Sequence, residues 1–88
     1  MHEQAVLRDL MRAMARLAQE QGARRVVAAQ VWLGALCHLS EAHFREHFAV
    51  ESHGTCAAGA TVTVEVSTDL NDPNASGVIL RSVELAVG

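Results

Sequence analysis

RVVAAQVWL, residues 25–33, predicts a strand with one clearly apolar face. Successive side chains of a strand point to opposite sides of the sheet. One side takes Val27, Ala29, Val31 and Leu33. The other side takes Val26, Ala28, Gln30 and Trp32. Gly34 then ends the strand.

Helical patterns lie on both sides of this strand. Apolar side chains recur at helical spacing over residues 3–21, and Gly22 follows, where a left-handed residue closes a helix at little steric cost. Ser40 is placed as the N-cap of a second helix that runs to about Ser52. In that helix Phe44 and Phe48 pair at i, i+4 toward the core.

Two further strands complete the predicted sheet. Residues 61–66 alternate cleanly, with Val62, Val64 and Val66 inward, and predict a half-buried antiparallel strand. A third strand is predicted over residues 78–87, after a solvated loop at residues 67–77. We therefore expect an α/β (α+β) fold with the order helix, strand, helix, strand, strand, in which two helices pack on one face of a three-stranded sheet.

The composition limits the kind of protein this can be. A chain of 88 residues has room for one domain with one core. A net charge of −3 argues against a nucleic-acid partner, because phosphate binding needs a positive surface. The sequence has no membrane-length apolar run and no secretory signal, so we expect a soluble, cytoplasmic protein. No catalytic constellation is recognisable, and we expect the protein not to be an enzyme.

The amino-terminal tripeptide Met1, His2 and Glu3 is the best candidate site. It offers the terminal amine, the His2 imidazole and backbone amides that a strongly bound divalent metal can deprotonate. Four nitrogens in a plane suit nickel(II) or copper(II) better than zinc, which prefers a tetrahedral site. On the tripeptide alone, the alternative is an ordinary first residue followed by an exposed histidine.

A second candidate site is the pair His43 and His47, which share a helix face at i, i+4 spacing and can chelate a metal. The alternative is two exposed polar residues. A stripe of arginines at i, i+4, i+8, formed by Arg8, Arg12 and Arg16, either meets an acidic partner or is a solvated face with local ion pairs.

Four residues flanking the second helix could converge as a softer metal site: Cys37, His38, His53 and Cys56. The alternative is that the two thiols pack as small apolar groups. A disulfide between them is not expected.

In order along the chain, several segments resemble the HypA family, the nickel metallochaperones of hydrogenase maturation. The segments are Met1-His2-Glu3 with the amphipathic helix after it, residues 22–26, residues 31–36, the helix of Phe44 and Phe48, Gly54-Thr55 before Gly59-Ala60, and residues 81–85. The resemblance implies that Met1, His2 and Glu3 bind Ni(II), with His2 supplying the imidazole and Glu3 its backbone amide or a nearby carboxylate. It also implies a HypB-type GTPase as partner and a [NiFe] hydrogenase, or urease, as client.

The sequence departs from this family between the second and third strands. Family members insert a zinc module with two C-x-x-C pairs there, whereas residues 67–77 contain no cysteine. We therefore expect a single HypA-like nickel-binding domain over residues 1–88 without structural zinc. The alternative is a metal-free interaction or regulatory module of the same pathway, which could share strands in a homodimer.

Overall fold

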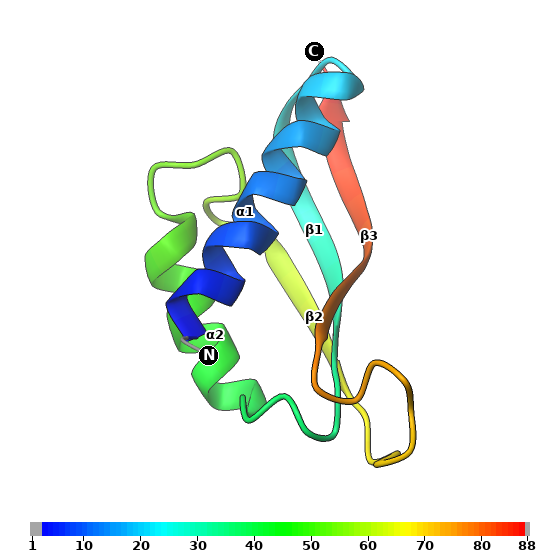
Figure 1. Ribbon diagram of the computed structural model, residues 1–88. Coiled ribbons are helices and arrows are strands. Elements are labelled where there is room, and N and C mark those ends of the chain that lie inside the picture. Colours follow the sequence, from blue (N-terminus) through cyan, green and yellow to red (C-terminus); the bar gives the residue numbers. More distant parts are fainter. Residues whose placement is uncertain (1–2, 88) are drawn as a thin grey trace.

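The structure, a computed structural model, describes residues 3–87, and the side chains of residues 4–87. Its elements are α1 (Glu3–Glu20), β1 (Ala23–Leu33), α2 (Glu41–Ser52), β2 (Thr61–Val66) and β3 (Val78–Val87). Both helices cover the same face of the three-stranded sheet (Figure 1). The predicted α+β class, element order and layer arrangement are confirmed.

The sheet has the order β2-β1-β3, and it is mixed. β1 pairs with β3 antiparallel, but with β2 parallel, so the prediction of an antiparallel strand at Thr61–Val66 was wrong. The reason lies in the connection: α2 lies between β1 and β2 and carries the chain back to the end where β1 began. Alternating polarity within a strand does not reveal its direction.

Bulges change which residues of β1 face the core. Val26 is opposite Leu85 and Ala28 is opposite Glu84, so β1 has one extra residue, Val27, between these pairs. Val26 is consequently 1% exposed and belongs to the core, whereas Val27 is only half-buried. The prediction that Val27 faced inward and Val26 outward was wrong at these two positions. It was correct for the residues beyond the bulge, Ala29, Val31 and Leu33, which all lie in the core.

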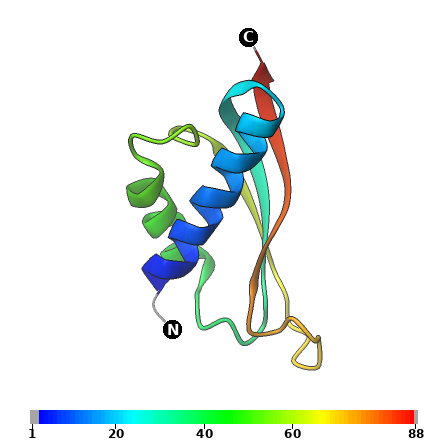
Figure 2. The same cartoon turned by 45° about the horizontal axis from the view of Figure 1, so that its top comes forward.

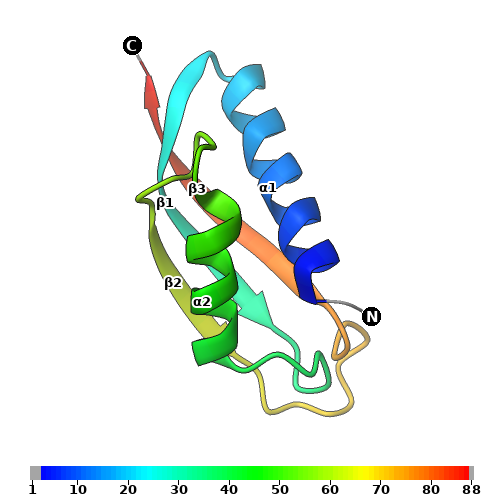
Figure 3. The ribbon, with the colours of Figure 1, turned by 90° about the vertical axis from the view of Figure 1, so that its left-hand side faces the viewer.

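The core lies between the helices and the sheet. α1 contributes Leu7 and Met14, both fully buried, and α2 contributes Phe44 and Phe48, whose ring centres are 6.0 Å apart. α2 begins as predicted, because the Ser40 hydroxyl accepts a hydrogen bond from the backbone N–H of His43 at 3.1 Å. Because both helices contribute to one core, they lie side by side on the sheet, and both begin at the same end of the molecule (Figure 3).

The helix-free face of the sheet carries polar side chains and one apolar pair, Trp32 of β1 opposite Ile79 of β3. Gln30 lies between Thr63 and Ser82, and the Ser82 hydroxyl donates to its side-chain oxygen at 3.2 Å. Trp32 is 4% exposed, with the Arg81 guanidinium 5.4 Å from its ring centre. Val66, predicted to face inward, is 50% exposed because it is the last residue of an edge strand.

Residues 67–77 carry the chain from β2 to β3 across the end of β1, because β1 lies between these two strands. The loop is pinned to the segment after β1: Gly34 N–H donates to the Gly77 carbonyl at 2.9 Å, and Leu36 N–H to the Ala75 carbonyl at 2.7 Å. Ala75 is buried, and the side chains of Asp69 and Asp72 close turns by accepting backbone N–H groups. The loop is largely exposed, as predicted, but docked at one point (Figure 2).

Candidate metal-binding site

The proposed nickel residues Met1 and His2 lie outside the described residues, and Glu3 is the first residue of α1. Glu3 being the first helical residue matters chemically, because the first N–H groups of a helix have no intrahelical carbonyl partner. The exposed residues Gln4 and Ala5 complete the first turn, and Leu7, fully buried one turn further on, holds the helix against the core. The start of α1 is thus an exposed helix end, and helix geometry leaves its first backbone amides without intrahelical partners.

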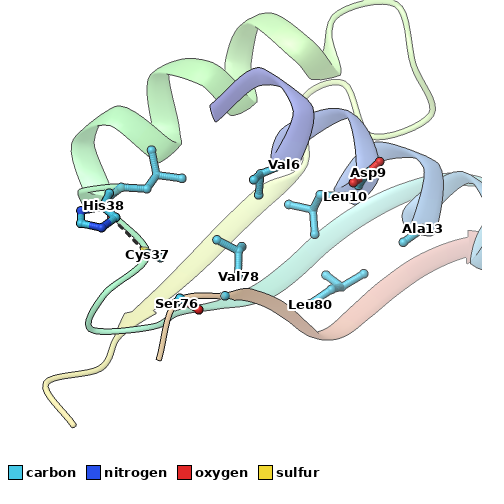
Figure 4. A pocket seen from close by; sticks show the side chains of 11 residues that line it. Val6, Asp9, Leu10, Ala13, Cys37, His38, Ser76, Val78 and Leu80 are labelled. Carbon is cyan, nitrogen blue, oxygen red and sulfur yellow. Dashed lines mark hydrogen bonds between the residues drawn. The ribbon is translucent and has the colours of Figure 1, made fainter. Parts of the chain in front are cut away.

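A groove of about 480 Å³ runs beside the first half of α1. Val6 and Leu10 from α1 face Val78 and Leu80 from β3 across it (Figure 4). Asp9, Cys37 and His38 also line the groove. The groove was not predicted from the sequence, because its two walls are separated by more than 60 residues and meet only in the folded chain.

The segment that closes one end of this groove has an unusual backbone conformation. His38 has φ +61°, in the left-handed region that non-glycine residues seldom occupy. The Cys37 thiol lies 3.5 Å from the carbonyl oxygen of Leu39, within reach of a weak hydrogen bond. This turn redirects the chain from β1 into the Ser40 cap of α2.

Cys37 and Cys56 lie at opposite ends of β1. The Cys56 carbonyl accepts a hydrogen bond from Val26 N–H at 2.8 Å near the start of β1, whereas Cys37 follows its end, donating its N–H to the Gly34 carbonyl at 3.1 Å. Val26 and Gly34 are eight residues apart, which at about 3.3 Å per residue is roughly 26 Å. Both thiols are free and pack half-buried against the core, as the packing alternative predicted.

A metal cluster does not form among these residues. Across residues 3–87, no three His, Cys, Asp or Glu side chains are grouped so that they could hold a metal ion. The convergence of Cys37 and His38 with His53 and Cys56 as a softer metal site is therefore contradicted. This separation could not be predicted from the sequence, because the residues meet or stay apart only through the way the loops pack at the two ends of β1.

The histidines of α2 are arranged as their spacing predicts. The His43 and His47 rings lie edge to face on one side of the helix, with centres 6.5 Å apart. His43 is exposed and His47 is half-buried.

The arginine stripe is engaged in ion pairs at two of its three positions. Arg12 pairs with Asp9 of its own helix at 3.2 Å, the local pairing that the sequence suggested. Arg8 instead reaches α2, where its Nε lies 3.8 Å from Glu51 Oε1. The second pair ties the start of α1 to the last turn of α2.

Within the described part of the chain, neither helix has the length and apolar character needed to cross a membrane.

Comparison with known proteins identifies a family. The family model HypA, described as hydrogenase/urease nickel incorporation, metallochaperone, hypA, matches residues 1–70. That match includes the amino-terminal tripeptide and extends through α1, β1, α2 and β2. Among curated proteins, none matches the sequence.

Solved structures with the same fold agree with this match. The solution structure of the Ni metallochaperone HypA from Helicobacter pylori superposes with a TM-score of 0.81 at 14% identity, covering 100% of both chains. A second solution structure of HypA protein gives a TM-score of 0.70 at 14% identity, covering 100% of this chain and 98% of that one. At such low identity these two likenesses show the fold alone.

Proposed function

The chain belongs to the HypA family of hydrogenase/urease nickel incorporation metallochaperones, and from this premise we propose that it binds Ni(II) at its amino terminus and delivers it to a nickel enzyme. The ligands would be the Met1 amine, the His2 imidazole and backbone amides, including that of Glu3. The observation that carries the proposal is the family match, which begins at residue 1 and so includes this tripeptide.

The position of Glu3 supports this choice of ligands. As the first residue of α1, it has a backbone amide with no intrahelical hydrogen bond to break, so deprotonation by nickel leaves the helix intact. The positive end of the helix dipole opposes a bare dication at this place. Two deprotonated amides cancel the charge of Ni(II), so the resulting neutral complex is compatible with a helix start.

The same proposal includes the biological setting. The protein would act in the cytoplasm as an accessory protein without catalytic activity, together with a HypB-type GTPase and a nickel-enzyme client such as [NiFe] hydrogenase. It would form one HypA-like domain in which residues 67–77 take the place of the family's zinc module. The support is family membership, together with a short loop that already closes the connection between β2 and β3.

The test is calorimetric titration of Ni(II) into the untagged chain, into His2→Ala, and into a chain extended by Gly-Ser before Met1. We expect high-affinity nickel binding in the unmodified chain and its loss in both altered chains, because one lacks the imidazole and the other displaces the amine. His53→Ala is the matched control, since it removes an exposed imidazole beyond the end of α2. Unchanged high-affinity binding in His2→Ala and in the extended chain would contradict the site.

A second candidate function is a metal-free interaction module, and the sheet supplies the observation in its favour. β2 and β3 form the two edges of the sheet, and an edge strand offers backbone groups that pair with another chain, including a second copy. This function predicts that His2→Ala leaves complex formation with a partner, or with itself, unchanged. Sedimentation of the unmodified chain and of His2→Ala, each at several concentrations, measures whether the change alters self-association.

A further inference from the structure

We propose that His43 and His47 of α2 form a second, weaker Ni(II) site beside the start of α1. Its role as a holding site for the cargo rests on the proposed function, but its ability to bind nickel does not. The site would be a chelate of two imidazoles, with water completing the coordination of the metal.

The geometry of the two rings carries this proposal. They lie on one side of α2, edge to face, with centres 6.5 Å apart. Metal–imidazole bonds of about 2.0 to 2.1 Å require the two donor nitrogens to lie within roughly 4 Å of each other. The two rings would reach that distance by rotating toward each other about their side-chain bonds, and the helix supplies the fixed one-turn spacing between their backbones.

The charges around the pair are favourable for a cation. Arg45 is the only arginine in α2, and it is held by Glu41 at 3.0 Å and by the Val62 carbonyl of the sheet at 2.8 Å. Its guanidinium is therefore drawn toward β2. Glu46, which is exposed, adds a negative charge to this stretch of α2 without grouping with the two histidines as a third ligand.

The packing of the two helices places this pair beside the start of α1. α1 and α2 run in the same general direction (Figures 1 and 3). Arg8 of α1 and Glu51 of α2 lie level with each other, as their ion pair shows. One turn earlier on both helices brings His47 level with Gln4, which directly follows the first residue of α1. The pair therefore lies beside the start of α1, whose first residue, Glu3, belongs to the proposed amino-terminal site.

The two sites differ in the geometry they impose on nickel, and this separates them experimentally. Four nitrogens in a plane give diamagnetic, square-planar Ni(II), whereas two imidazoles with water give paramagnetic, six-coordinate Ni(II). Titration of the untagged, isotope-labelled chain with Ni(II) should show two steps by calorimetry. The weaker step should broaden the NMR signals of residues around His43 and His47.

The variants are His43→Gln, His47→Gln and the control His53→Gln. Each removes one imidazole from an exposed or half-exposed position, so the fold should be retained, which circular dichroism checks. We expect His43→Gln and His47→Gln each to weaken the second step at least tenfold and to abolish the local broadening. His53→Gln should leave both steps unchanged.

The outcomes distinguish the two proposals. Loss of the weaker step in the α2 variants supports the pair, whether or not His2→Ala affects the tighter step. If His2→Ala leaves the tighter binding step unchanged, only the proposed amino-terminal site is contradicted. The pair is overturned if the unmodified chain shows no second step, if the α2 variants retain it, or if His53→Gln weakens it equally.

Discussion

Gly34 and the carbonyl oxygen of Ala75 are packed so closely that no side chain fits between them. A Cβ at residue 34 would lie far inside van der Waals contact with that oxygen and with the Asn74 carbonyl oxygen. Two hydrogen bonds flank the contact, from Gly34 to Gly77 and from Leu36 to Ala75. Glycine at residue 34 is what lets the 67–77 loop dock across the end of β1.

Gly34→Ala should therefore destabilise the protein by about 1 to 3 kcal/mol, the usual cost of forcing extra atoms into a packed site. Urea unfolding monitored by Trp32 fluorescence measures it. Gly77→Ala is the matched control in the same loop, because a Cβ there would meet the Asn74 carbonyl oxygen at 3.4 Å, an ordinary van der Waals contact. Equal losses from both changes would contradict a specific role for Gly34.

Ser40→Ala should cost about 1 kcal/mol, because the first turn of α2 loses the acceptor for His43 N–H. Ser40→Asp should retain most of the stability, since aspartate is an equally good N-cap. Thermal unfolding of the three proteins checks this. If Ser40→Asp were as unstable as Ser40→Ala, the cap would not be the reason.

Phe44→Ala should be the most damaging of these changes, at about 3 to 5 kcal/mol, because the Phe44 side chain is fully buried in the centre of the core. A domain of this size has a total stability of only about 4 to 13 kcal/mol. The control is Val50→Ala on the same helix, which is 71% exposed and should change stability by less than about 0.5 kcal/mol. Chemical denaturation measures both variants, and equal losses of stability from Phe44→Ala and Val50→Ala would contradict the assignment of the buried face of α2.

Cys37 and Cys56 should remain unlinked within one chain under oxidising conditions. A disulfide needs Cα atoms within about 7 Å, and these residues lie at opposite ends of β1. Mass spectrometry of the oxidised, alkylated chain should find no intramolecular bond in the folded state. An intramolecular disulfide would contradict the placement of Cys56 beside Val26, near the start of β1.

Nickel binding at the amino terminus should weaken as the pH falls from 7.5 to 5.5. The amine and imidazole have reference pKa values of roughly 7.7 to 8.0 and 6.5, so both take up protons over this range and cease to be ligands. Proton release from the amides adds to the same dependence. We expect an affinity loss of more than roughly tenfold, measured by competition with a chelator of known pH dependence. A flat profile would contradict an amine and amide donor set.

The local elements could be predicted from the sequence because local rules govern them. The helical repeat of residues 3–20, the Ser40 cap and the Gly22 terminus, where φ is +66°, each depend on neighbours within one turn. The class, the element order and the i, i+4 arrangement of the α2 histidines follow from such rules. The amino-terminal nickel residues were also named from the sequence, and they remain a prediction.

Only the tertiary structure decided the direction of β2, the inward position of Val26, the groove beside α1, and the distance that separates the two cysteines. Each depends on atoms far apart in sequence: a crossover helix turns a strand parallel, and a bulge against β3 shifts the alternation of β1. No acidic residue lies three or four positions from Arg8 on its own helix, and only the packing of the two helices brings it to Glu51. Side-chain periodicity and capping specify each helix or strand by itself. The direction of a strand, its register and the residues that it contacts depend on how the elements bury one another.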